Sequence, residues 1–279
     1  MLEQRLVDYL IRKKRGTVRP VPDDFSFATP DRPAAGRFIL PGITPDDDPG
    51  LTFEEANGRY DVAFEPPKPC LASRNIALKS TSSVRGHFVD VGRNRVLSFE
   101  SVLEYLMGNI LVANSDTILV EDQPPELAFE FDGEKRQTID FRATNRRHFR
   151  IGYAVKAADQ LERDMTMRKA KAIAAVHVPT FADKILVCTE FEITKDLGWN
   201  AVDINDARQE RCQKDCDRVL EFLLGVGKPI EIWRVQDKLD DESGVWNALL
   251  CLHHDRLVQI ERPDRRFTDA ALVTPVTRH

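Results

Sequence analysis

The stretch that decides the fold is QTIDFRATNRRHFRIGYAVK, residues Gln137 to Lys156. Apolar side chains alternate on both sides of a polar turn, so we predict two adjacent strands. Asp140 lies on the first strand and Lys156 ends the second. A metal site on such a hairpin would use a second acid two residues before the lysine, where this chain has Ala154. The pattern leaves open an active metal site, a decayed one and an ordinary hairpin.

The bulk composition is that of a soluble globular protein. The chain has 279 residues, 42% hydrophobic and 30% charged, and a net charge of -5. This length predicts two domains with an additional arm. No apolar run approaches the ~18–20 residues that span a membrane. The N-terminal segment contains acids and an alternating apolar pattern, so we do not expect a signal peptide. Five scattered cysteines, an odd number, favour a reducing compartment, so we expect a cytoplasmic protein.

Basic residues cluster locally although the net charge is mildly acidic. Taken singly, each cluster is more readily a solvated face than a phosphate-binding surface. Taken together, they favour a surface that faces DNA. The clusters lie at residues 11–19, 92–95, 146–150 and 168–171.

Three parts follow one another along the chain. Residues 4–14 have the apolar spacing of a short amphipathic helix. The stretch 18–70 is rich in Pro, Asp and Gly, which excludes long helices and central strands. We therefore predict an N-terminal helix with a Pro-rich arm over residues 1–70, an α/β domain over 71–193 and a C-terminal domain over 194–279.

The α/β domain has the pattern of strands and helices in alternation. We predict two strands around Gly92, then a helix capped by Ser98. A turn at Asp132-Gly133 leads into the strand that holds Asp140. A long Ala-rich helix follows over residues 157–178, and a strand within 183–194 closes the domain.

The C-terminal domain begins with a helix over residues 207–225 that ends at Gly225. The helix has an apolar face, and shorter helices and a terminal strand pair follow it. This order is typical of a small winged helix-turn-helix domain and is equally compatible with a helical cap. The residues predicted to face the core are Val219, Leu220, Leu223 and Leu224.

The candidate site combines three acids and a lysine. Glu100 and Glu104 are four residues apart, so on one helix their carboxylates share a face, as those of many surface acids do. Asp140 and Lys156 follow on neighbouring strands. Magnesium takes carboxylate oxygens from two elements and activates a water, and a lysine stabilises developing phosphate charge. This set fits phosphodiester hydrolysis better than zinc chemistry.

The chain from residue 85 to 189 resembles the TnsA-like transposon endonucleases, a branch of the restriction-endonuclease-like superfamily. Four pieces match in order: VRGHFVDVGRNRVLSFESVLEYLM, VEDQPPELAF, TIDF and YAVKAADQLE. The resemblance implies an α/β core with a mixed sheet flanked by helices. It also implies an N-terminal arm and a C-terminal winged-helix-like domain.

The resemblance implies roles for particular residues. Glu104 and Asp140 would bind the metal, Mg²⁺ with Mn²⁺ as a substitute, and Lys156 would be the catalytic lysine. The backbone carbonyl of Val155 could also reach the metal.

Two neighbouring positions carry weaker implications. Glu100 would support the site rather than bind the metal directly. Ala154 stands where the family usually has a glutamine and the wider superfamily a glutamate. This departure puts the strength of metal binding in doubt, not the fold.

Other residues have two readings each. Gln123 either lines the site or is a polar residue at a strand end, and the second reading is favoured. Three basic residues are DNA backbone contacts or solvated charges: Lys79, Arg85 and Arg93. A further set lacks the spacing of a standard zinc finger: Cys212, Cys216, Cys251, His253 and His254. Cys251 lies in an apolar helical run, so we expect it in the core.

The resemblance implies a metal-dependent endonuclease subunit of a heteromeric transposase that cleaves one DNA strand at transposon ends. Its partners would be an integrase-type transposase subunit and an AAA-type ATPase regulator. Two alternatives stay open: a stand-alone restriction or repair nuclease of the same superfamily, and a non-catalytic DNA-binding or scaffold subunit whose site has decayed.

Overall fold

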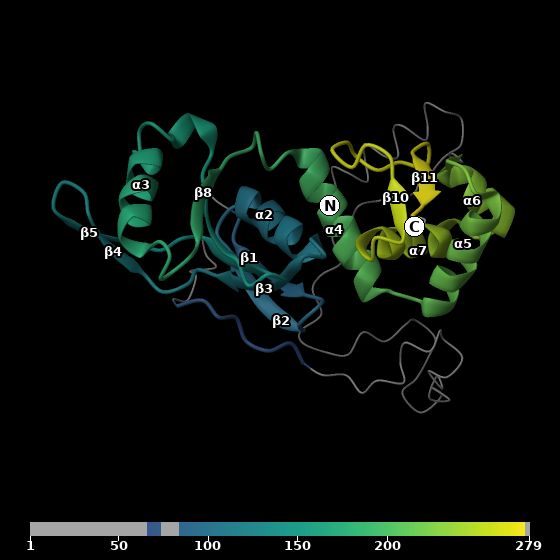
Figure 1. Cartoon of the computed structure of the whole chain (residues 1–279), viewed down its shortest axis with the longest axis horizontal. Helices are drawn as coiled ribbons and strands as arrows, with labels where there is room; N and C mark the ends of the chain where they lie inside the picture. The colour runs from purple at the N-terminus through teal and green to yellow at the C-terminus, as the bar shows by residue number, and fades with distance from the viewer. Residues whose placement is uncertain (1–65, 74–83, 277–279) are drawn as a thin grey trace, which may run out of the picture. The chain divides into compact units, whose positions relative to one another are not determined.

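The structure, a computed structural model, describes residues 66–73 and 84–276 (Figure 1). Four predictions lie outside these residues: the helix at 4–14, the basic cluster at 11–19, Lys79 and nearly all of the arm at 18–70. Among the helices that are described, none combines the length and the apolar character needed to cross a bilayer.

The described residues form six α-helices and eleven strands. The helices are α2 (Val102–Ala113), α3 (Thr166–His177), α4 (Lys195–Gln209), α5 (Gln213–Val226), α6 (Ile232–Leu239) and α7 (Glu242–His254). The strands are β1 (Gly86–Asp90), β2 (Arg95–Phe99), β3 (Thr117–Asp122), β4 (Leu127–Glu130), β5 (Glu134–Gln137), β6 (Phe141–Asn145), β7 (Arg150–Val155), β8 (Lys184–Cys188), β9 (Ile230–Glu231), β10 (Val258–Ile260) and β11 (Leu272–Pro275).

A four-stranded mixed sheet, in the order β3-β6-β7-β8, carries the candidate site. The pairs β3–β6 and β6–β7 are antiparallel, whereas β7 and β8 run parallel. The parallel pair is joined through α3, because parallel neighbours need a long crossover. The prediction of an α/β chain with a mixed sheet is thereby confirmed.

Helices cover both faces of this sheet. Side chains of α2, among them Leu106, form one apolar cluster with Phe141 and Val155. On the other face, Ile173 of α3 packs in a second cluster with Ala154. Ala154 and Val155 are consecutive in β7, so their side chains point to opposite faces. The sheet is therefore covered by α2 on one face and by α3 on the other.

Two hairpins lie beside the sheet. Strands β1 and β2 pair antiparallel around the turn that contains Gly92, as predicted. Strands β4 and β5 pair through a turn in which Asp132 has φ 49° and Gly133 has φ 93°. Aspartate and glycine tolerate such left-handed angles, so the predicted turn at Asp132-Gly133 is confirmed. The strand that follows it, β5, ends at Gln137 and does not hold Asp140, so that part of the prediction was wrong.

Three predicted boundaries were wrong. Helix α2 is capped by Ser101 and not by Ser98, which lies buried in β2. Helix α3 begins only at Thr166, after a short 3₁₀ turn over Ala158–Gln160. Asp140 does not lie on a strand but immediately before β6.

The C-terminal residues form α5, α6 and α7 around a three-stranded sheet in the order β10-β11-β9. The single helix predicted over 207–225 is two helices, because the chain breaks after Gln209 and α5 ends at Gly227 with φ 62°. Val219 and Leu223 are fully buried, as predicted, and Leu220 is half-buried. Leu224 is 53% exposed, so its predicted core position was wrong.

Helix α4 packs against both α2 and α7. Its Val202 belongs to the cluster beneath the four-stranded sheet, and its Ile204 belongs to the C-terminal cluster. The predicted domain boundaries at residues 70 and 193 stay predictions.

We expect Phe141→Ala to destabilise the fold by about 3–5 kcal/mol, the usual cost of emptying a fully buried phenylalanine site. Phe141 has no exposed surface and follows Asp140 directly. Phe149→Ala is the matched control, because Phe149 is 43% exposed at the hairpin tip. Urea unfolding of both variants measures the difference, and equal losses would contradict the assignment of the core.

Candidate active site

Asp140 is the buried acid at the centre of the candidate site. Pairing of Phe141 with Tyr153 puts Asp140 opposite the last residues of β7, and its Oδ2 accepts a hydrogen bond of 2.7 Å from the Val155 N–H. Burial raises the pKa of Asp140 to about 7, and the negative charge of Glu104 adds to the rise. The Val155 N–H and the charge of Lys156 oppose it. The cost of burying the charged form thus outweighs the contacts that stabilise the ionised carboxyl.

Glu104 lies at the N-terminus of α2, where it also caps the helix. Ser101 Oγ accepts from the Glu104 N–H at 3.1 Å and donates to Glu104 Oε1 at 3.0 Å. Glu104 Oε2 accepts from the Glu100 N–H at 2.7 Å. This arrangement resembles a capping box, except that the carboxylate accepts from the N–H of Glu100 and not from that of the N-cap residue Ser101, and it gives Glu104 a structural role. Each carboxylate oxygen has a second lone pair, so capping leaves acceptor capacity for a cation.

Glu100 is placed differently from the prediction. It precedes the Ser101 cap and lies outside α2, so it does not share a helix face with Glu104. Its carboxylate instead accepts from Gln123 Nε2 at 3.2 Å and lies 3.7 Å from a guanidinium nitrogen of Arg85. Glu100 therefore supports the site from its edge, and Arg85 is bound to this acid.

Lys156 follows β7 directly, and its N–H donates to the Cys188 carbonyl at 3.0 Å. Its ammonium group lies 2.7 Å from Asp164 Oδ2, and both side chains are about one-third exposed. The charge of Lys156 acts on Asp140, but its ion pair is with Asp164. A phosphate that binds beside Lys156 has to compete with Asp164.

Ala154 contributes no oxygen to the site. Its side chain is buried in the apolar cluster with Leu127, Ile139 and Ile173. A longer acid at this position would put its carboxylate against that cluster. Val155 contributes its backbone, of which the N–H is bound to Asp140.

Gln123 lies at the end of a strand and also contacts one of the candidate acids. It directly follows β3, is 2% exposed and has φ 39°. Its Nε2 bonds to Glu100, whereas its buried Oε1 has no hydrogen-bond partner. Sequence reasoning had favoured an ordinary polar residue at a strand end, and the structure puts it beside the acids.

The donor set fits a hard divalent cation. The carboxylates of Asp140 and Glu104 interact electrostatically, and the nearby unpartnered atom of Gln123 is also an oxygen. Magnesium prefers such oxygen ligands and retains several waters. Within residues 66–73 and 84–276, no group of three or more His, Cys, Asp and Glu side chains has metal-binding geometry. A cation here would thus depend on two acids together with amide, carbonyl or water oxygens.

The cysteines and histidines near the C-terminus have structural contacts. Cys251 is fully buried, as predicted, and its Sγ donates to the Ala207 carbonyl. His253 and His254 contact the backbone carbonyls of Val258 and Ala113.

The basic clusters are distributed over both ends of the sheet. Arg93 donates to the Asp90 carboxylate and to the carbonyls of Thr117 and Ile118, which gives it a structural role. The cluster at 146–150 lies at the turn between β6 and β7, whereas Asp140 and Lys156 lie at the other end of these strands. The two ends are ~20 Å apart, since a strand rises ~3.3 Å per residue.

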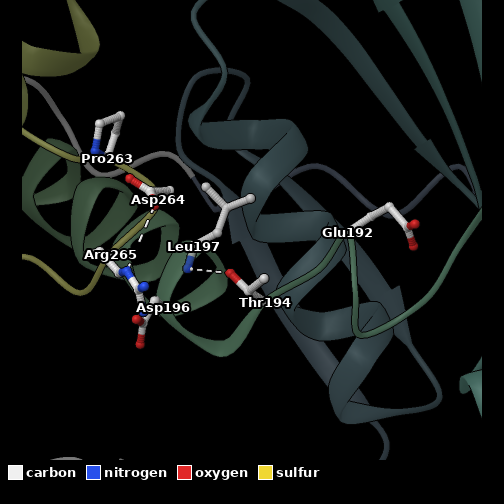
Figure 2. Close-up of a pocket in the computed structure, with 7 residues that line it drawn as sticks. All are labelled: Glu192, Thr194, Asp196, Leu197, Pro263, Asp264 and Arg265. Atoms are coloured by element: carbon white, nitrogen blue, oxygen red, sulfur yellow. Dashed lines mark hydrogen bonds and ion pairs between the residues drawn. The ribbon is translucent and has the colours of Figure 1, made fainter.

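A separate pocket lies where α4 begins (Figure 2). Thr194 Oγ1 caps the helix by accepting from the Leu197 N–H. In the loop that precedes β11, the Arg265 guanidinium lies 3.8 Å from the carboxylate of its neighbour Asp264. The pocket contains none of the predicted site residues. Its lining is Glu192, Thr194, Asp196, Leu197, Pro263, Asp264 and Arg265.

Comparison with known proteins adds no family assignment. No protein-family model matches the chain, and no curated protein matches it at a significant level.

Proposed function

We propose that this chain is a magnesium-dependent DNA endonuclease subunit of a heteromeric transposase, related to the TnsA-like transposon endonucleases. One observation carries the proposal: a buried acid before β6 and a lysine after β7 meet at one end of a mixed sheet, with Glu104 close by. A mixed sheet flanked by helices, with these residues at its edge, is what the resemblance implies. We also propose that the four-stranded sheet and its helices form a restriction-endonuclease-like core.

Each residue has a distinct part in the proposed reaction. Asp140 and Glu104 would hold the cation, and a cation bound there would supply water activation and neutralisation of phosphate charge. The Val155 N–H fixes the orientation of Asp140. The ammonium group of Lys156 would leave Asp164 and contact an oxygen of the scissile phosphate. Its point charge would stabilise the negative charge that develops there.

The C-terminal residues support a role in assembly with partners. Their order, a helix followed by β9, α6, α7, β10 and β11, supports the proposed winged-helix-like domain. Helix α7 is largely buried, with Val245, Leu249 and Leu252 in the core. Trp233 of α6 is 45% exposed and lies 5.0 Å from the Arg234 guanidinium, so α6 offers an aromatic contact to a protein partner. The proposed partners are an integrase-type transposase subunit and an AAA-type ATPase regulator.

A strand-nicking assay tests the function. The purified chain is incubated with end-labelled duplex and Mn²⁺, alone and with a candidate integrase-type transposase partner. Nicks that require this partner support the proposed subunit, and nicks by the chain alone favour a stand-alone nuclease. DNA binding without nicks under either condition favours a non-catalytic scaffold.

The proposal also predicts which basic surface holds DNA. Helix α3 contains Arg168, Lys169 and Lys171 and no acid, and Arg168 and Lys171 are exposed. The segment before it joins the site through the Lys156–Asp164 ion pair. We expect Arg168→Ala with Lys171→Ala to lower the slope of log affinity against log salt by roughly two, about one per lost phosphate contact.

Arg146→Ala with Arg147→Ala is the matched control, because it removes the same charge from the far end of the sheet. Fluorescence anisotropy over a salt series measures both double variants. An equal or larger effect of the control pair would contradict the proposed DNA path along α3.

A further inference from the structure

Gln123 has an unusual combination of burial, backbone strain and incomplete hydrogen bonding. Its side chain is among the largest that are fully buried, and its backbone is left-handed at φ 39°. Residues other than glycine, asparagine and aspartate rarely adopt this conformation, which costs free energy. Strain of this kind persists where the surrounding structure holds it and is concentrated at functional sites.

Three hydrogen bonds to backbone atoms of Gln123 hold it in this conformation. Its N–H donates to the Asp140 carbonyl at 2.8 Å. Its carbonyl accepts from the N–H of Ser73 at 2.9 Å and from Ser73 Oγ at 3.0 Å. The backbone of Gln123 is thus tied directly to the residue that carries the buried acid.

The amide orientation follows from its contact with Glu100. Nε2 donates to Glu100 Oε2 at 3.2 Å. The reversed orientation would place Oε1, an acceptor, against a carboxylate oxygen, also an acceptor. The contact with Glu100 therefore selects the orientation that leaves Oε1 buried without a partner. A buried acceptor of this kind usually has a ligand, an ion or a water as its partner.

We propose that Gln123 Oε1 is an oxygen ligand, direct or through one water, of the divalent cation held by Asp140 and Glu104. It would add an amide oxygen to a site in which Ala154 supplies no side-chain oxygen. The inference rests on the metal site of the proposed function. It adds an amide from the end of β3 to a site whose acids come from the start of β6 and from α2.

Mn²⁺ titration followed by electron paramagnetic resonance tests the inference, with Gln123→Met and Gln123→Glu beside the unchanged chain. Methionine keeps the volume but removes both polar atoms, and glutamate keeps the acceptor but removes the donor. We expect Gln123→Met to weaken Mn²⁺ binding about 10- to 100-fold, as loss of a metal-site partner commonly does. We expect Gln123→Glu to bind at least as tightly as the unchanged chain.

Thermal unfolding without metal separates this role from a structural one. Gln123→Met should unfold at the same temperature or higher, because it removes an unsatisfied buried acceptor. Wild-type Mn²⁺ affinity in Gln123→Met overturns the inference alone. Equal weakening in both variants also overturns it, since the donor bond to Glu100 would then be the part that matters. Absence of binding by the unchanged chain overturns the inference together with the proposed function.

Discussion

Asp140→Asn should abolish metal-dependent DNA cleavage, at least ~10³-fold, while making the metal-free protein more stable at pH 8. The charged carboxylate of Asp140 is needed to bind the cation but destabilises the metal-free protein. Its removal therefore lowers cleavage and raises stability. Asparagine can still accept the hydrogen bond that the Val155 N–H donates to Asp140. It carries no charge, so it neither binds the cation well nor opposes Glu104.

The pH dependence follows from the pKa of Asp140, which burial raises from 3.8 to about 7 in the folded protein. The folded state thus binds this proton more tightly than the unfolded state. Between about pH 4 and 7 the free energy of unfolding of the metal-free protein should fall as pH rises. A pKa shift from 3.8 to about 7 corresponds to a decrease in the free energy of unfolding on the order of 4 kcal/mol. Asp140→Asn should lack this loss.

Urea unfolding of both proteins at pH 5 and pH 8 measures the effect. Asp183→Asn is the matched control, because Asp183 Oδ2 accepts a 2.7 Å hydrogen bond from the Arg150 N–H at the other end of β7. The control should gain no stability at pH 8 and keep its cleavage activity. If Asp140→Asn is no more stable than the unchanged chain at pH 8, the buried charge of Asp140 does not destabilise the metal-free protein.

Lys156→Ala should lower cleavage by about 10²- to 10⁴-fold and leave the fold and Mn²⁺ affinity nearly unchanged. Its ion pair with Asp164 is partly exposed, and exposed ion pairs contribute little to stability. The loss should appear in the chemical step, because the lysine acts on charge that develops at the phosphate. Single-turnover nicking with saturating Mn²⁺ measures it.

Two further variants refine this prediction. Lys156→Arg keeps the charge but replaces a compact ammonium with a planar fork, so cleavage should stay low while DNA affinity is kept. Asp164→Asn removes the acid that competes for Lys156, so its cleavage should equal or exceed that of the unchanged chain. Cleavage that survives in Lys156→Ala would remove this residue from the proposed chemistry.

Local sequence signals predicted the parts of the fold that local contacts decide. Alternation and the Asp132-Gly133 pair predicted a hairpin, and Gly92 marked the turn between β1 and β2. The cap of α2 was misplaced although a local signal existed. Ser101 and Glu104 have the Ser-x-x-Glu spacing of a capping box, which favours Ser101 over Ser98.

Other features depend on residues distant in the sequence. The break before α5 has neither glycine nor proline. Arg211 in this break lies 2.8 Å from Asp255, which is distant in the sequence. The position of Gln123 depends on Ser73, Glu100 and Asp140 together. Such placements are determined by tertiary contacts, so propensity and spacing could not predict them.

The most direct test of the account is calorimetric titration of Mn²⁺ into the unchanged chain and into Asp140→Asn at pH 7.5, with a short duplex present. The account predicts binding by the unchanged chain and none by the variant, with protons released as Asp140 ionises. Equal binding by both proteins, or none by either, would contradict a metal site at Asp140 and leave the scaffold alternative.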